Sequence, residues 1–215
     1  ETPNLDRLAK QGMRFTDAYA AAPVCSPTRC AVLTGQAPAR IGLTTHLPGL
    51  FFPKDGRLQP AKLTPQLNGE HVTIAERMKE AGYASAFFGK WHIAPTSGKG
   101  GQVAKEVSPT GQGFDLNVGG TSYGGPPSFF SPYRNAELPD GPDGEYLPDR
   151  LVDETIRFTE ANKDKPWIAH LWFYTVHWPM QAPKGLLEKY AERKGPGLND
   201  TRYGAMIEAM DLAIG

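Results

Sequence analysis

Residues 83–92 read YASAFFGKWH, and this stretch decides the expected fold. Its first six residues form a short, largely apolar segment bounded by glycines, a pattern that suits a strand buried on both faces. Just before it, Thr73 and Glu76 form a capping-box pattern that opens a helix over 73–81. The sequence therefore predicts a helix leading into a buried strand, with Lys90 and His92 at the strand's carboxyl end.

Helical and strand-like segments alternate on either side of this stretch. Helices are expected over 2–12, 26–35, 148–162 and 203–212, and strands over 13–19 and 167–175. This alternation predicts an α/β fold with a mostly parallel sheet flanked by helices on both faces. A chain of 215 residues is long enough for one such domain, so we expect a single domain over 1–215.

Two long polar segments interrupt the alternation. Residues 44–70 and 93–147 are rich in turn-forming residues and are expected to be loops. Long irregular segments in a compact domain are usually functional, so we expect them to build a substrate pocket. Four aromatic residues of the second segment are candidates for stacking on sugar rings: Tyr123, Phe129, Phe130 and Tyr133.

Composition indicates a globular protein without a nucleic-acid or membrane partner. The chain has 23 basic and 23 acidic residues, and no apolar run approaches the roughly 18 residues of a membrane span. It begins without Met or a leader pattern, so any export signal has been removed or lies outside this sequence. With only two cysteines, Cys25 and Cys30, a disulfide scaffold is excluded.

Reactive side chains occur where the predicted elements end. Cys25 precedes a predicted helix, Lys90 and His92 follow one strand, and His177 follows another. Ligands of open α/β sheets bind outside the carboxyl ends of the strands, and a helix N-terminus favours an anion. Lys90, Arg29 and the two histidines would surround that anion with positive charge and hydrogen-bond donors. The set is typical of a site for a tetrahedral oxyanion.

These residues carry a specific resemblance. The motif CSPTR at 25–29 resembles the sulfatase signature Cys-x-Pro-Ser/Thr-Arg, and GYASAFFGKWH at 82–92 resembles the family's second signature. Segments 2–9 and 177–179 also match, so the resemblance covers essentially the whole chain. It implies an alkaline-phosphatase-like fold, incomplete in this sequence, with 1–215 as the N-terminal part of one catalytic domain.

The resemblance also implies the chemistry. Cys25 would be oxidised to formylglycine by a formylglycine-generating enzyme, and Arg29 would hold the modified residue. Lys90 would contact both formylglycine and the sulfate, His92 would assist proton movement, and His177 would bind sulfate near the leaving oxygen. A calcium ion would neutralise the sulfate, with modified Cys25 as one ligand.

The family's other metal ligands are not found in this sequence. Its paired aspartates lie before segment 2–9, and its Asp-Asn pair lies beyond the last predicted helix. We therefore expect the 215 residues alone to bind calcium poorly and to be inactive. By resemblance the location is periplasmic or secreted, and a sulfated carbohydrate is preferred over a small aryl sulfate as the substrate.

Structural roles compete with functional ones at several positions. An isolated Cys near a helix start is more often a small buried hydrophobe than a nucleophile, and Cys30 is expected to be a core residue. A Cys25–Cys30 disulfide is a minor alternative. His170 lies within a strand pattern, which favours a structural role. His46 and His71 are expected at the surface, although His46 could touch substrate.

Three other functions remain open at this point. A phosphate or phosphonate ester hydrolase of the same superfamily would bind a similar oxyanion. A thiol hydrolase would use unmodified Cys25 with His92 or His177. A non-catalytic binder of sulfated glycans would keep the pocket without the turnover.

Overall fold

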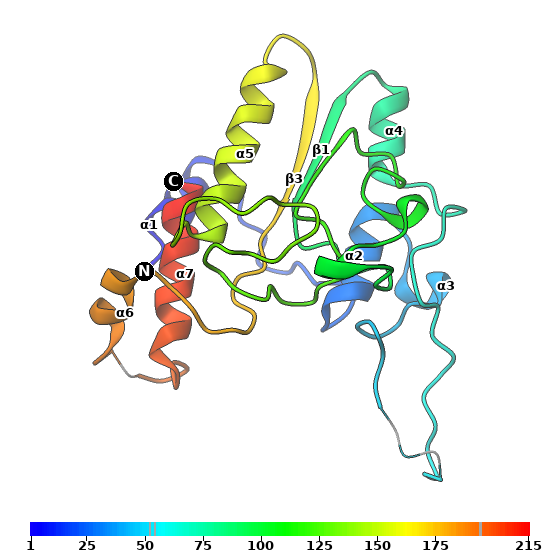
Figure 1. Ribbon diagram of the computed structural model, residues 1–215, viewed down its shortest axis with the longest axis horizontal. Helices are drawn as coiled ribbons and strands as arrows, with labels where there is room; N and C mark the ends of the chain where they lie inside the picture. Colours follow the sequence, from blue (N-terminus) through cyan, green and yellow to red (C-terminus); the bar gives the residue numbers. More distant parts are fainter. Residues whose placement is uncertain (52, 54, 194) are drawn as a thin grey trace.

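A three-stranded parallel sheet lies at the centre of the computed structural model, which describes residues 1–51, 53, 55–193 and 195–215 (Figure 1). The strands are β1 (Ala84–Gly89), β2 (Leu116–Val118) and β3 (Trp167–Trp172), in the order β2-β1-β3. Each neighbour pairs in parallel with β1, with Ala86 opposite both Leu116 and Ala169. The predicted parallel sheet is confirmed, but β2 was missed because it is a three-residue strand inside a segment expected to be a loop.

Seven α-helices and two 3₁₀ turns are found among the described residues. The helices are α1 (Pro3–Gln11), α2 (Cys25–Thr34), α3 (Pro38–Ile41), α4 (Ile74–Glu80), α5 (Leu147–Ala161), α6 (Lys184–Tyr190) and α7 (Thr201–Ile214), and the turns are η1 (Lys99–Gly101) and η2 (Lys105–Val107). The five expected helices correspond to α1, α2, α4, α5 and α7 within a few residues at each end. The short helices α3 and α6 were not predicted.

The central strand divides the interior into two cores. Side chains alternate across a strand, so Ala86 and Phe88 pack with α5 and α7, whereas Phe87 packs with residues of α2 and α4. Contacts of β1 with both α4 and α5 place helices on the two sides of the sheet, as expected (Figure 1). Burial on both faces explains why β1 carries an almost continuous apolar run.

The strand expected over 13–19 does not form. Its large side chains are mostly exposed, with Met13 at 78%, Phe15 at 72% and Tyr19 at 89%. A strand is stable only when its backbone N–H and C=O groups find partners, and neither edge of the described sheet pairs with this segment. The alternating sequence was therefore not sufficient to form a strand.

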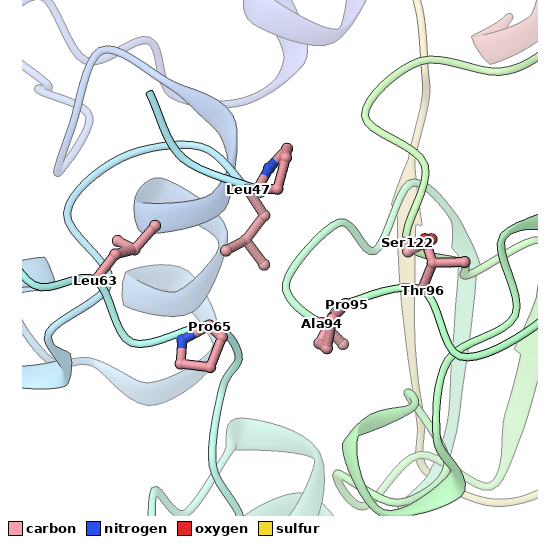
Figure 2. Close-up of a pocket in the computed structure, with 8 residues that line it drawn as sticks. Leu47, Leu63, Pro65, Ala94, Pro95, Thr96 and Ser122 are labelled. Atoms are coloured by element: carbon pink, nitrogen blue, oxygen red, sulfur yellow. The ribbon is translucent and has the colours of Figure 1, made fainter. Parts of the chain in front are cut away.

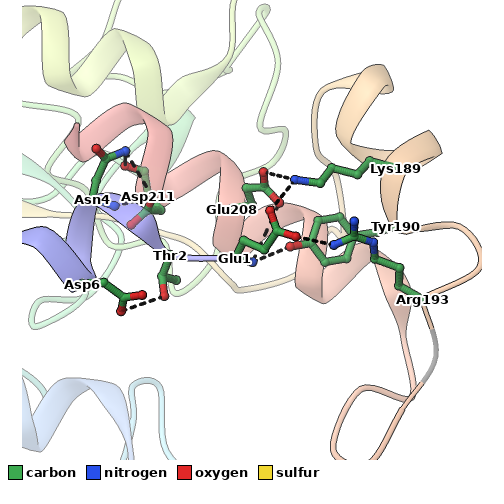
Figure 3. A network of polar contacts seen from close by, with 9 residues as sticks. All are labelled: Glu1, Thr2, Asn4, Asp6, Lys189, Tyr190, Arg193, Glu208 and Asp211. Atoms are coloured by element: carbon green, nitrogen blue, oxygen red, sulfur yellow. Dashed lines mark hydrogen bonds and ion pairs between the residues drawn. The ribbon is translucent and has the colours of Figure 1, made fainter.

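The first helix is held by the last one (Figure 3). Thr2 provides no side-chain cap for α1, and instead the buried carboxylate of Asp211 in α7 accepts the backbone N–H groups of Asn4 at 3.1 Å and Leu5 at 2.8 Å. An acidic group at a helix N-terminus satisfies unpaired N–H groups and complements the helix dipole. The carboxylate of Glu1 also accepts a hydrogen bond from Lys189 at 2.8 Å.

No helix in the described part of the chain combines the length and apolar character that a membrane crossing requires.

Candidate functional site

Four predicted site residues line one cavity. Cys25, Lys90, His92 and His177 contribute to the walls of a space of about 630 Å³. Cys25 comes from the start of α2, Lys90 and His92 from the segment after β1, and His177 from the segment after β3. His46, from the loop over 44–70, lies on the same wall. The cavity thus lies at the carboxyl ends of the strands, where open α/β sheets bind ligands.

Cys25 is the first residue of α2, whereas it was expected just before the helix. Val24 occupies the cap position, and Cys25 therefore lies in the first turn, where backbone N–H groups lack helical partners. Lys90 is near enough for its charge to interact with Cys25, and both side chains line the same cavity. Both cysteines are free thiols, so the alternative disulfide is not formed. Cys30 is fully buried, and burial raises its pKa to about 12, which agrees with the expected core role.

Ser26 connects the nucleophile segment to His92. It lies inside α2, and its side chain is fully buried. The hydroxyl donates to the His92 carbonyl at 2.7 Å and accepts the backbone N–H of Leu47 at 3.0 Å. Ser26 therefore satisfies two backbone groups that line the wall of the site.

Leu47, in the loop over 44–70, sets the protonation state of His92. Nε2 of His92 lies 2.8 Å from the carbonyl of Leu47, which only accepts, so Nε2 carries the hydrogen. Burial, helped by the charge on Lys90, lowers the pKa of His92 to about 4. Nδ1 is buried and has no hydrogen-bond partner. His92 is consequently a neutral imidazole with a free acceptor nitrogen, the form required of a base.

Two consecutive glycines pack against the imidazoles. A Cβ on Gly124 would lie 2.7 Å from Cε1 of His92, and a Cβ on Gly125 would lie 2.4 Å from Nδ1 of His177. Neither position has room for a side chain unless an imidazole moves. Neither residue was predicted as part of the site, although a Gly-Gly pair within a functional loop is a sign of close backbone approach.

Lys90 keeps its charge near neutral pH. Burial lowers its pKa to about 8, the interaction with Cys25 opposes this effect, and nearby Arg29 adds to it. The preceding Gly89 has φ 95°, and a Cβ there would lie 2.2 Å from the Trp172 carbonyl. Glycine at this point lets the chain turn out of β1 and place the lysine above the sheet.

Arg29 lies beneath the cavity and does not line it. Its Nη1 donates to the Lys90 carbonyl, and its guanidinium stacks over Trp172 at 4.9 Å from the ring centroid. Burial lowers the pKa of Arg29 to about 10, with Cys25 acting in the opposite direction. The guanidinium thus supports the backbone at Lys90 and places a positive charge close to Cys25.

His177 is more accessible to solvent than His92. Its Nδ1 lies 3.3 Å from the carbonyl of Trp178, which fixes Nδ1 as the protonated nitrogen and leaves Nε2 free. Burial, together with the charge on Lys90, lowers the pKa of His177. An anion bound between Lys90 and His177 would act against this lowering.

The remaining histidines separate into different roles. His170 lies in β3 and packs edge-on against Phe114 at 5.2 Å, outside the cavity, in agreement with the structural role expected. His46 lines the cavity and is half-buried. His71 is also half-buried, with Nε2 3.7 Å from Glu70, so the expectation that these two residues lie at the surface was wrong.

Most of the aromatic residues proposed for sugar stacking belong to the core. Phe129 and Tyr133 are buried almost completely, and Phe130 packs against Tyr146 at 5.0 Å. Phe129 and Tyr133 are too deep in the protein to meet a sugar, and the partly buried Phe130 does not line the cavity. Tyr123 alone among the four lines the cavity that contains Cys25.

A smaller apolar cavity of about 240 Å³ adjoins the site (Figure 2). Leu63, Pro65, Ala94 and Pro95 form much of its wall, and Leu47 is shared with the larger cavity. It lies between the loop over 44–70 and the segment after β1. Both expected pocket-forming loops therefore contribute to the space around Cys25.

Calcium ligands are not found together in the described part of the chain. No group of three or more His, Cys, Asp or Glu side chains there has a metal-binding arrangement. The cavity around Cys25 has lysine and histidine nitrogens and a few hydroxyl groups in its wall but no carboxylate, whereas calcium takes six to eight oxygen ligands. The residues present do not fit a calcium site by themselves.

The sequence is similar to those of named sulfatases. It is 38% identical to the N-acetylgalactosamine-6-sulfatase of Sus scrofa and 28% identical to arylsulfatase J of Mus musculus, in each case over the whole of this chain. The alignments cover 41% and 34% of those proteins. The chain thus spans well under half the length of these relatives.

Solved structures share the fold. The crystal structure of Ps i-CgsB in complex with k-i-k-neocarrahexaose superposes with a TM-score of 0.74 and 26% identity, over all of this chain and 48% of that one. The PsFucS1 sulfatase from Pseudoalteromonas sp. gives a TM-score of 0.62 at 23% identity, over 99% of this chain and 44% of that one. The sequence also matches the family described as Sulfatase over residues 1–215. The chain belongs to the sulfatase family.

Proposed function

We propose that the whole protein hydrolyses a sulfate ester of a carbohydrate with a nucleophile made from Cys25. The observation that carries this proposal is the convergence of Cys25, Lys90, His92 and His177 on one cavity. A thiol at a helix start, a neighbouring lysine and a neutral imidazole supply a nucleophile, a positive charge and a base. In this reading, residues 1–215 are the N-terminal part of a single catalytic domain.

Oxidation of Cys25 to formylglycine supplies the nucleophile in this proposal. Its hydrate would carry two hydroxyls. One would attack sulfur and displace the sugar alcohol, which leaves with a proton. The other would then lose its proton, and the aldehyde would re-form as the bond between its carbon and the sulfate oxygen breaks. The Cys25 side chain faces the cavity and interacts with Lys90, so this position suits such a group. A formylglycine-generating enzyme would then be a partner during maturation.

The surrounding side chains have separate tasks. Lys90, mostly protonated at neutral pH, would neutralise charge on the sulfate and on the attacking oxygen. Nδ1 of His92 would accept a proton from a hydroxyl, because its other nitrogen is occupied by Leu47. His177, once protonated beside the bound anion, would donate from Nε2 to the sulfate on the side of the leaving oxygen. Arg29 would act through the backbone at Lys90 and through its charge near Cys25.

Three finer assignments belong to the same proposal. A carbohydrate substrate is supported by the sugar-sulfatase name of the pig relative and by the oligosaccharide bound in the Ps i-CgsB crystal. Calcium is the metal that the family resemblance implies, with modified Cys25 as the candidate ligand among the described residues. A periplasmic or secreted location follows from the family resemblance.

The test begins with mass spectrometry of the Cys25 peptide from the full-length protein made with a maturing enzyme. We expect formylglycine at position 25 and turnover of sulfated sugars that Cys25→Ala abolishes. A free thiol with retained hydrolysis, sensitive to thiol alkylation, would favour the thiol hydrolase. Faster turnover of phosphate esters than of sulfate esters would favour the phosphate ester hydrolase. Tight glycan binding without turnover would favour the non-catalytic binder.

A further inference from the structure

A second cavity joins the site through a shared side chain. A space of about 450 Å³ is lined by residues of η1 and of the segment over 134–140, including Lys99, Arg134 and Asp140. Tyr123 belongs to the walls of both this cavity and the one that contains Cys25. A ligand longer than one sugar that leaves the Cys25 cavity along Tyr123 therefore enters a space with two cationic side chains.

The wall between the two cavities is firmly built. The Tyr123 ring lies on the backbone of Gly101, where a Cβ would be only 2.9 Å from the ring. Ser122 donates to the Gly101 carbonyl from its backbone N–H at 2.9 Å and from its hydroxyl at 3.0 Å. The N–H of Ala136 donates to the Gly100 carbonyl at 2.9 Å. These bonds fix η1, Tyr123 and the segment after Tyr133 relative to one another.

Charge in this second cavity is unbalanced toward positive. Within the described residues, neither Lys99 nor Arg134 takes part in an ion pair, and both side chains are exposed. Arg134 also has φ 54°, a left-handed conformation that non-glycine residues rarely adopt and that often marks a ligand-binding position. The one carboxylate in the wall, Asp140, accepts the backbone N–H of Tyr133 with one oxygen.

We propose that Lys99 and Arg134 form a subsite for a second anionic group, a sulfate or a carboxylate, on the sugar next to the one whose sulfate is hydrolysed. This inference rests on the proposed function and narrows its substrate to a glycan with more than one negative charge. Tyr123 separates the two subsites and offers its ring to the sugar between them. Asp140 weakens the subsite by its charge.

The test compares three disaccharides on the full-length enzyme. One carries the hydrolysed sulfate alone, one carries a second sulfate on the neighbouring sugar, and one carries a carboxylate there. We expect Lys99→Ala/Arg134→Ala to raise KM for the doubly charged substrates by about 5-fold at low salt and to leave the monosulfated one unchanged, because two exposed charge interactions are lost. This rise in KM should be smaller in about 0.5 M salt, because salt screens interactions between exposed charges.

Two further variants sharpen the comparison. Asp140→Asn keeps an oxygen acceptor for Tyr133 but removes the charge, so KM for the doubly charged substrates should fall. Lys163→Ala/Lys165→Ala removes the same charge from the loop before β3, at the opposite end of the strands, and should change none of the three KM values.

The outcomes separate the two proposals. If the wild-type enzyme hydrolyses all three substrates but Lys99→Ala/Arg134→Ala changes every KM equally, or none, the subsite is wrong and the proposed function stands. If wild-type enzyme with confirmed formylglycine hydrolyses none of them, both are overturned. A preference for sulfate over carboxylate, lost in the double variant, would identify the second group.

Discussion

Arg29 donates a hydrogen bond to the backbone carbonyl of Lys90 while its guanidinium lies on the face of Trp172. A planar, always charged group performs both tasks at once, and a lysine ammonium does not. We predict that Arg29→Lys in the full-length enzyme lowers kcat/KM by about 10²-fold, the scale of a displaced charge-stabilising group. Rates must be divided by the formylglycine content measured on each preparation. Arg157→Lys, at an exposed position of α5, is the control, and an active Arg29→Lys enzyme would contradict the supporting role.

Gly124→Ala tests the close approach to His92. The added methyl group would push the imidazole away from Leu47, so we expect kcat to fall by at least about 10-fold, as for a displaced acid–base group. Thermal stability should change much less than activity. Gly69→Ala is the matched control, since a Cβ there meets nothing within 4 Å. Equal losses in the two variants would argue against the packing explanation.

Lys90→Ala and His177→Ala should each reduce turnover by at least about 10²-fold, because each removes a preorganised group at the sulfate. Steady-state kinetics on a sulfated monosaccharide provide the measurement. His170→Gln is the control histidine, and it should leave kcat within a few-fold of the wild type. A silent His177 together with a sensitive His170 would overturn the assignment of both.

Ser26→Ala should destabilise the fold by about 1–3 kcal/mol, the cost of leaving buried polar groups unpaired. The groups affected are the His92 carbonyl and the Leu47 N–H, both bound to the buried hydroxyl. Urea unfolding followed by tryptophan fluorescence gives the difference in free energy. Thr159→Ala is the control, because it removes an exposed hydroxyl from α5 and should lower the free energy of unfolding by less.

His170 should make stability depend on pH. Burial lowers its pKa below the ordinary value of about 6.5 that it regains on unfolding. The unfolded chain therefore binds the proton more readily, and the stability present above about pH 6.5 declines as the pH falls below it. The difference in urea midpoint between wild type and His170→Gln, measured at pH 7.5 and 5.5, should be larger at the higher pH. A difference that did not vary with pH would contradict a neutral buried imidazole.

Much of the scaffold was predictable because local chemistry agreed with the final structure. Thr73 and Glu76 form the predicted capping box, with the Glu76 N–H donating to the Thr73 hydroxyl at 3.3 Å. The apolar run of β1 marked a strand covered on both faces. The segment over 13–19 alternates in part between apolar and polar residues, but a strand depends on partners that its own sequence does not specify.

The cavity was less predictable than the residues that line it. Motifs singled out Cys25, Lys90, His92 and His177, and the structure brings these side chains to one space. The roles of Ser26 and Leu47 had no local signal, because each depends on a contact with a segment far away in the chain. Phe129 and Tyr133 were predicted to contact sugar because they are aromatic. The large apolar surface of an aromatic side chain also favours burial, and both residues lie in the core.

The capping of α1 by Asp211 sets an order of assembly during translation. The carboxylate is 207 positions after Asn4, so the first helix leaves the ribosome long before its cap exists. At about 5–20 residues per second the delay is about 10–40 s. A nine-residue helix is not stable in isolation, so α1 stays unfolded throughout that interval. Helix α1 is therefore among the last described elements to become ordered, and until then it is open to chaperones and proteases.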